Sequence, residues 1–357
     1  MGTQTLRMLA IWGMSMLVVP VTGAAIGPSI AAPAAIEGAG ATFPAPLFAE
    51  WARIYTEKTG IAIHYAAMGS GAGIERIQRK EVDFAATDAP LTPEAQQRMG
   101  IAQFPVVIGG VVPVVNIAGI NPGALTLNGQ VLGDIYLGKI RKWSDPAIAS
   151  LNPGLSLPNS NITVVHRADA SGTTFLWTDY LAKVNHDWQS RIGSGTRVDW
   201  PVGVSGIGNQ GVASYVQRTR MSIGYVEYAY ARINYLSHVA LLNKDGLRVQ
   251  PTRDGFAAAL ATSNWQQAPG FFQIPTDMPG ATSWPITGAS FLLLRASTEQ
   301  PAQSREAMKF FSWALASGQA AAERLDYVAL PADLLRQVEQ AFKTEVRDTS
   351  GNAVWQP

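Results

Sequence analysis

Residues 36–65 read IEGAGATFPAPLFAEWARIYTEKTGIAIHY, and this stretch decides the fold. A short strand is expected near residues 36–39. The chain then turns at Thr42, whose hydroxyl is expected to cap a helix over residues 44–58. Residues 61–65 alternate between apolar and polar side chains, as a strand does. Strand, helix and strand in this order indicate an α/β fold with a mainly parallel sheet.

Two apolar segments farther along the chain organise the rest of it. The run over residues 104–117 is nearly uncharged and too long for one ordinary strand, so it is predicted to cross between two lobes. Residues 284–294 resemble a second, returning crossing. The other predicted elements are a helix over 71–80, a strand over 82–87, strand-rich segments over 126–136 and 161–166, a helix over 171–184 and a mostly helical segment over 303–344.

The N-terminal segment is predicted to be a secretory signal peptide. Arg7 is the only charged residue among the first 36, and an apolar stretch over residues 8–20 follows it. Small residues come next, and cleavage is expected after Ala34, with Ala24 and Ala31 as alternatives. The predicted division is therefore 1–34 signal peptide, 35–107 plus 284–357 as lobe 1, and 108–283 as lobe 2.

Composition limits the classes of function. The 357 residues are 47% hydrophobic and 15% charged, which is ample for packed cores. The formal net charge is +1 and no dense run of Lys and Arg occurs, so no nucleic-acid surface is expected. Cysteine is absent, so stability in the expected periplasm-like compartment must come from the cores rather than from disulfides. Any anion site must be local and built from few residues.

The segment from Arg167 to Thr174, RADASGTT, has the groups that an oxyanion needs. The guanidinium of Arg167 can hold two oxygens of a tetrahedral anion and stays charged, and Asp169 could orient it. Ser171, Gly172 and Thr173 follow at the expected start of a helix, where backbone N–H groups are unpaired. The alternative is an ordinary capped helix beside a surface ion pair.

Two earlier turns repeat this pattern. Thr42 and Phe43 lie where a strand ends and a helix begins, so their N–H groups and the Thr42 hydroxyl are candidate donors. Ser70 is the candidate donor in the glycine-rich segment GSGAG, residues 69–73. Either turn alone would more often be an ordinary glycine-permitted turn.

Asp88, in the segment TDAP, indicates which anion is bound. A carboxylate repels an anion unless that anion offers a proton. Hydrogen phosphate carries a P–OH group and sulfate carries none, and a site built around one required hydrogen bond discriminates by about 10⁴-fold or more. The alternative role, a cap for the following helix, suits Asp88 poorly because Thr92 and Pro93 already mark that helix start.

Other motifs carry no chemistry. Residues 206–211 read GIGNQG and match the dinucleotide fingerprint, but the preceding strand is short and broken by Pro201, so a loop leading into a helix is expected. No His or Asp cluster has metal-ligand spacing, and no nucleophile elbow occurs. We therefore expect no catalytic residue, no metal and no cofactor.

With these segments the chain resembles the periplasmic phosphate-binding proteins of high-affinity phosphate ABC transporters. The resemblance runs from about Glu37 to Thr349. Its most specific segments are GAGATFP (38–44), DFAATDAP (83–90), GDIYLGKI (133–140) and IGYVEYAY (223–230). The glycine-rich turn departs from the family pattern, because relatives often have a second serine there where this chain has Gly71 and Ala72.

The resemblance implies a two-lobed type II periplasmic-binding-protein fold, with two mainly parallel sheets flanked by helices and joined by two crossing strands. It implies a monomer that is no enzyme, binds inorganic phosphate and delivers it to the transmembrane permease subunits of an ABC transporter. The implied phosphate contacts are Thr42, Phe43, Ser70, Asp88, Arg167, Ser171, Gly172 and Thr173. A binding protein for arsenate, sulfate or molybdate, an exported phosphatase, and an adhesive or sensory protein are the alternatives.

Overall fold

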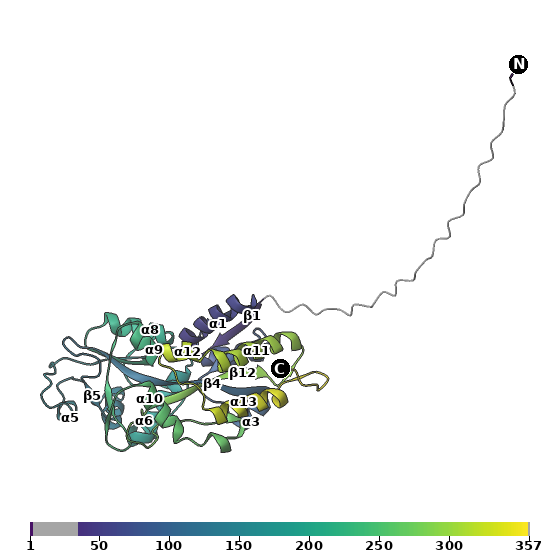
Figure 1. The fold of residues 1–357 in the computed structure, drawn as a ribbon. Coiled ribbons are helices and arrows are strands. Elements are labelled where there is room, and N and C mark those ends of the chain that lie inside the picture. Colours follow the sequence, from purple (N-terminus) through teal and green to yellow (C-terminus); the bar gives the residue numbers. More distant parts are fainter. Residues whose placement is uncertain (3–34, 356–357) are drawn as a thin grey trace. The chain divides into compact units, whose positions relative to one another are not determined.

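The computed structural model describes residues 1–2 and 35–355, and the described residues from 35 onward belong to one compact unit (Figure 1). Apart from its first two residues, the segment predicted as a signal peptide, residues 1–34, lies outside the described residues.

The main sheet of the described chain has nine strands. Its order is β2-β1-β3-β12-β4-β8-β6-β7, with β9 paired to β4. These strands are β1 (Ala35–Gly40), β2 (Ala62–Ala67), β3 (Phe84–Thr87), β4 (Ile101–Asn116), β6 (Thr163–Arg167), β7 (Val204–Gly206), β8 (Ser222–Glu227), β9 (Ser237–His238) and β12 (Thr287–Arg295). The set β2-β1-β3 is parallel, and so is the set β8-β6-β7. The antiparallel strands β12 and β4 join the two sets, which confirms the predicted α/β class. The two mainly parallel sheets of the prediction are two parallel parts of one continuous mixed sheet.

Strand β4 is the central connection. Residues 101–110 pair with β12, and Val111–Asn116 pair with β8. Nearly all of its 16 residues are buried, which explains the long uncharged run in the sequence. Pro105 in β4 has no N–H to donate, and the β12–β4 ladder has a bulge there, between Ser290 and Phe291.

Helices connect the parallel strands and cover the sheet (Figure 1). They are α1 (Ala45–Thr59), α2 (Ser70–Gln78), α3 (Pro93–Met99), α4 (Gly129–Tyr136), α5 (Pro146–Ser150), α6 (Gly172–Val184), α7 (His186–Arg191), α8 (Gly208–Arg218), α9 (Tyr228–Ile233), α10 (Arg253–Ala261), α11 (Pro301–Ser317), α12 (Gln319–Arg324) and α13 (Ala332–Glu345), with 3₁₀ turns at Trp265–Gln267 and Pro269–Phe271. The small strands are β5 (Thr126–Leu127), β10 (Ala240–Leu242), β11 (Arg248–Val249), β13 (Ser297–Thr298) and β14 (Arg347–Asp348).

Aromatic packing fixes the first helix on the sheet. Phe48 of α1 meets Tyr65 of β2 and Phe311 of α11 edge to face, with ring centroids 5.0 and 5.4 Å apart. Such pairs stabilise the core beyond the burial of their area, by about 0.5–1.5 kcal/mol each. Gly60 ends α1 at a φ of 76°, a left-handed conformation that glycine adopts without strain.

Two predictions about local structure were wrong. Residues 126–136, predicted as strand-rich, form only the two-residue β5 before α4 begins. The Asn128 side chain caps α4 by accepting the Val131 N–H at 2.8 Å, and this cap outweighs the strand pattern. Thr42 does not cap α1: Pro44 occupies the cap position, and no side chain there accepts a backbone N–H. The Thr42 hydroxyl is used elsewhere.

Candidate functional site

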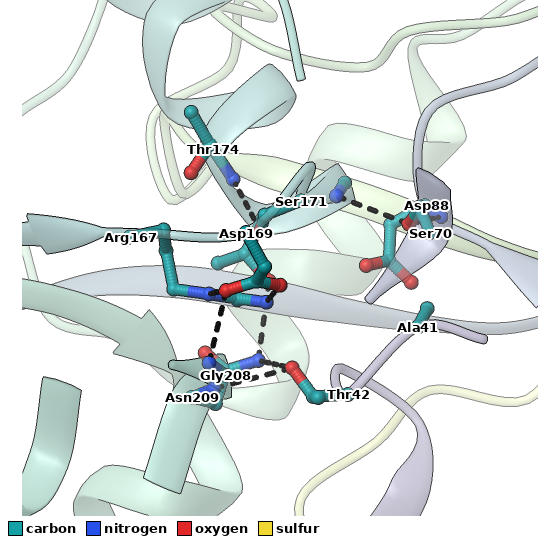
Figure 2. A network of polar contacts seen from close by, with 12 residues as sticks. Ala41, Thr42, Ser70, Asp88, Arg167, Asp169, Ser171, Thr174, Gly208 and Asn209 are labelled. Carbon is teal, nitrogen blue, oxygen red and sulfur yellow. Dashed lines mark hydrogen bonds and ion pairs between the residues drawn. The ribbon is translucent and has the colours of Figure 1, made fainter. Parts of the chain in front are cut away.

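The candidate site is built from the segments that follow the parallel strands. The ends of parallel strands lie at one edge of their sheet, which is where open α/β sheets bind ligands. Thr42 and Phe43 follow β1, Ser70 begins α2 after β2, and Asp88 follows β3. Arg167 ends β6, and the start of α6 comes directly after it. Figure 2 shows Ser70 and Asp88 on one side, facing Arg167, Asp169 and Ser171 on the other.

Arg167 is the only cation in this group of segments and is 3% exposed. Its Nε donates to Asp169 Oδ1 at 2.8 Å, and its Nη2 donates to Oδ2 (Figure 2). Asp169 also accepts the Gly208 N–H at 3.0 Å. Burial raises the pKa of Asp169, but its bonds to Arg167 outweigh this and hold the pKa below its usual value. The predicted pair is confirmed, and with side chains 1% and 15% exposed it is not a surface ion pair.

One nitrogen of Arg167 remains without a partner. Within the described residues, Nη1 is buried and has no hydrogen bond. Leaving a charged donor unpaired in a protein interior costs more than about 1–3 kcal/mol. An acceptor at this position, such as an anion oxygen, would remove that cost.

Asp88 is 1% exposed and lies opposite the start of α6. Its Oδ1 accepts a hydrogen bond from Ser290 Oγ at 2.5 Å. Burial raises the pKa of Asp88 to about 7, while Ser290 and Arg167 act in the opposite direction. A Cβ atom added to Gly172 would lie 2.7 Å from Asp88 Oδ2, so only glycine permits this approach.

Ser70 joins the two sides of the site. Its Oγ accepts the Gly172 N–H at 3.0 Å and the Asp88 N–H at 3.3 Å. The neighbouring Gly71 donates its N–H to the Ala170 carbonyl at 3.0 Å. The glycine-rich turn after β2 therefore contacts the segment that carries Arg167.

Asn209 connects two of the predicted hydroxyl donors. Its backbone N–H and its Nδ2 donate to Thr42 Oγ1 at 3.2 and 2.8 Å, and Nδ2 also donates to Thr173 Oγ1 at 3.2 Å. Its Oδ1 accepts the Glu227 N–H at 2.9 Å. Because Asn209 supplies protons to both threonine hydroxyls, the hydrogen of each hydroxyl is left to be donated elsewhere.

Phe43 and Ser171 have structural roles in addition to the predicted ones. The Phe43 ring is fully buried, and its carbonyl accepts a hydrogen bond from Tyr327 Oη at 2.7 Å. Ser171 Oγ caps α6 by accepting the Thr174 N–H at 3.1 Å. The capped helix considered for this segment is therefore present, and Gly172 and Thr173 form its first turn.

Several residues around the site were not predicted from the sequence. Asn209 lies in the GIGNQG segment, which does lead into a helix, α8, as predicted. Ser290 lies far along the chain, and no local signal marked it. Two tyrosines were also missed: Tyr230 Oη donates to the Thr42 carbonyl at 2.8 Å, and Tyr327 Oη lies 2.9 Å from Glu227 Oε2.

Other kinds of site find no support in the part of the chain that the structure describes. There, no group of three or more His, Asp or Glu side chains is placed to hold a metal ion. None of the helices formed by residues 35–355 combines the length and the apolar character that a membrane crossing requires.

Known proteins resemble the chain over nearly its whole length. The model of the PBP superfamily domain matches residues 27–317. Phosphate-binding protein PstS of Pasteurella multocida is 49% identical over 321 residues, which cover 90% of this chain and 93% of that protein. Phosphate-binding protein PstS of Haemophilus influenzae is 48% identical and covers 87% of this chain and 93% of its own. A human phosphate-binding apolipoprotein has a similar fold, with a TM-score of 0.70 at 20% identity, covering 90% of this chain and all of that structure.

Proposed function

Because this chain belongs to the PstS family of phosphate-binding proteins within the PBP superfamily, we propose that it binds inorganic phosphate and delivers it to the permease of an ABC transporter for import. The ligand is hydrogen phosphate. The chain itself catalyses no reaction, and ATP is hydrolysed by a separate subunit of the transporter.

One observation supports the proposal: a buried cation and a buried carboxyl that interact electrostatically each keep a polar atom without a hydrogen-bond partner. Arg167 Nη1 is a donor without a partner, and Asp88 Oδ2 accepts no hydrogen bond from any described residue. A ligand that suits both must present anionic oxygens and also a proton. Hydrogen phosphate meets both requirements, whereas sulfate offers no proton to Asp88.

The proposed contacts are divided between the two sides of the site. On one side Asp88 accepts the P–OH, while hydroxyls and backbone N–H groups donate. On the other side Arg167 and the first turn of α6 bind the anionic oxygens, with the helix N-terminus favouring negative charge. The complete set is Thr42, Phe43, Ser70, Asp88, Arg167, Ser171, Gly172 and Thr173.

We further propose two lobes, residues 35–107 plus 284–357 and residues 108–283, that close around phosphate. The change of β4 pairing partner at Gly110 and Val111, from β12 to β8, supports a hinge near that point. Phosphate would favour the closed state because it contacts both lobes only there. The protein acts in the periplasm as a monomer, after removal of residues 1–34.

Calorimetry on purified residues 35–357 tests the ligand. Titrations with phosphate, arsenate and sulfate should give tight binding of the first two, with Kd of about 1 μM or below for phosphate, and no measurable heat for sulfate. Binding of sulfate or molybdate in preference to phosphate would assign the chain to another oxyanion.

Transport is tested separately in cells. Deleting the gene should abolish high-affinity phosphate uptake, and the intact chain should restore it. Uptake that continues without the chain would point to an adhesive or sensory protein. Release of product from a chromogenic phosphate ester by the purified chain would instead indicate a phosphatase.

A further inference from the structure

The pairing of two distant strands places Ser290 beside Asp88. Strands β3 and β12 are antiparallel, with Thr87 opposite Phe291. Extending this register by one residue puts Asp88 opposite Ser290. Ser290 is therefore held in the sheet, and Asp88 is the first residue after the end of β3.

The ladder between β12 and β4 has a bulge next to Ser290, where β4 carries one additional residue, Val106. The β12–β4 register shifts between Ser290 and Phe291, where Pro105 cannot donate to the ladder. Bulges redirect side chains and occur next to functional sites. Here Ser290 is fully buried, and its Oγ lies 2.5 Å from Asp88 Oδ1.

The hydrogen bond leaves the two carboxyl oxygens of Asp88 unequal. Oδ1 accepts the Ser290 hydroxyl, while no described residue donates to Oδ2, which faces Gly172 at the start of α6. A donor on Oδ1 stabilises the ionised form and works against burial. The oxygen that remains free is then an acceptor rather than an O–H donor.

We propose that Ser290 is a positioning residue for anion selectivity, whose hydroxyl holds Asp88 as a carboxylate with Oδ2 turned to the proton of the ligand. The proposal rests on the proposed function, because it concerns how the same site recognises the P–OH group. Ser290 itself does not contact the ligand.

A substitution at Ser290 leaves the other charged and titratable residues around Asp88 in place. Arg167 on β6 favours the carboxylate, whereas Glu227 on β8 is itself a buried acid whose pKa burial raises. The remaining titratable groups that sense Asp88 are the tyrosines Tyr65, Tyr230 and Tyr327. These tyrosines all have pKa values raised by burial, so they stay neutral across the range tested below.

Ser290→Ala removes the donor and leaves Asp88 protonated to a higher pH. Losing a hydrogen bond to a charged group should move the titration of Asp88 upward by about one to two pH units. A protonated Asp88 donates to any oxyanion and no longer selects the P–OH. At pH 8 the variant should therefore lose about tenfold or more of the ratio of phosphate to sulfate affinity.

The experiment is competition calorimetry with phosphate and sulfate from pH 5.5 to 9.5. The parent chain, Ser290→Ala, Ser290→Thr and the control Ser304→Ala are compared. Ser304 is also buried, and its hydroxyl bonds Thr298 on another element. At each pH the protonation of free phosphate is the same for every variant. Dividing the ratio of phosphate to sulfate affinity of a variant by that of the parent therefore leaves only the effect of the substitution.

The expected result is a loss of selectivity in Ser290→Ala that is small at pH 5.5, largest near pH 8 and smaller again at pH 9.5. Ser290→Thr, which keeps a hydroxyl donor, and Ser304→Ala should follow the parent. A purely structural defect would lower the affinity by the same factor at every pH, and such parallel profiles overturn the proposal. Failure of the parent to bind phosphate overturns the proposed function instead.

Two further variants keep the test decisive if Ser290→Ala does not fold. Ser290→Cys preserves the shape but offers a weak donor, so a smaller shift in the same direction is expected. In an Asp88→Asn background, removing the Ser290 hydroxyl should leave the ratio of phosphate to sulfate affinity unchanged within about twofold. A full tenfold loss in that background would show that Ser290 acts independently of Asp88.

Discussion

The role proposed for Asp88 is to set anion selectivity through the single proton that it accepts. An amide in its place can donate to a fully deprotonated oxyanion. We expect Asp88→Asn to bind sulfate measurably, and the ratio of phosphate to sulfate affinity to fall by at least about 100-fold. Competition calorimetry at pH 8 measures this ratio. An unchanged ratio would remove Asp88 from its proposed role.

Arg167 provides the positive charge of the site. Arg167→Ala should weaken phosphate binding by at least about 2 kcal/mol, because it removes a buried charge and leaves Asp169 without its partner. The exposed pair of Arg336 and Asp333 on α13 offers a matched control, and Arg336→Ala should bind phosphate as the parent does. If calorimetry finds the affinity of Arg167→Ala intact, the phosphate site lies elsewhere.

The chemistry proposed for the site rests on signals that are local or depend on residue type. Arg167 and Asp169 are two positions apart, and the carboxyl of Asp88 stands out in a set of candidate anion-binding turns. Ser290 could not be predicted, because it reaches Asp88 only through the pairing of strands 202 residues apart in the chain. The Thr42 hydroxyl was predicted to be a cap for a similar reason: its true partner, Asn209, lies 167 residues away.

At the scale of elements, Asn209 at the start of α8 orients two hydroxyls, that of Thr42 before α1 and that of Thr173 at the start of α6. Asn209→Asp keeps an acceptor for the Glu227 N–H but loses the Nδ2 donors and adds a negative charge. We expect Asn209→Ala to lower the phosphate affinity about 10- to 100-fold, and Asn209→Asp to lower it further.

Calorimetry checks this order, and Asn234→Ala serves as the control. The Asn234 side chain contacts Gln210, which lies on α8 like Asn209, but Asn234 itself lies outside the site. Asn234→Ala should therefore bind phosphate as tightly as the parent. If both Asn209→Ala and Asn209→Asp bound phosphate as tightly as the parent, donation from Asn209 Nδ2 to the threonine hydroxyls would be unimportant.

The alternation of strands and helices was predictable because the spacing of apolar residues differs between helices and strands and can be seen in short segments. The first three strands and the first helix were placed nearly to the residue. The error at residues 126–136 arose because one capping side chain, that of Asn128, decides between two conformations of an apolar segment. The pairing of β4 with two different partners depends on tertiary packing and cannot be deduced from its sequence alone.

At the scale of the whole molecule, burying Asp88 couples folding to pH. Its folded pKa of about 7 lies above the usual value, so the folded chain binds a proton more tightly than the unfolded chain does. This contribution to stability is fully present below about pH 4 and is lost as the pH rises through 7. Asp88→Asn should therefore raise the free energy of unfolding at pH 8, by up to about 4 kcal/mol, and have little effect at pH 4.

Urea unfolding in phosphate-free buffer at both pH values measures this difference. The same gain at pH 4 and pH 8 would show that the stabilisation does not come from the titration of Asp88.

The contacts of Thr42 with Asn209, of Ser70 with Gly172 and of Gly71 with Ala170 join the two sides of the candidate site. An anion held among them could leave only after these contacts had separated. Its residence time would then follow the rate of that separation, in which its own bonds to one of the two sides must also break. A competing anion, at any concentration, could therefore not hasten the exchange.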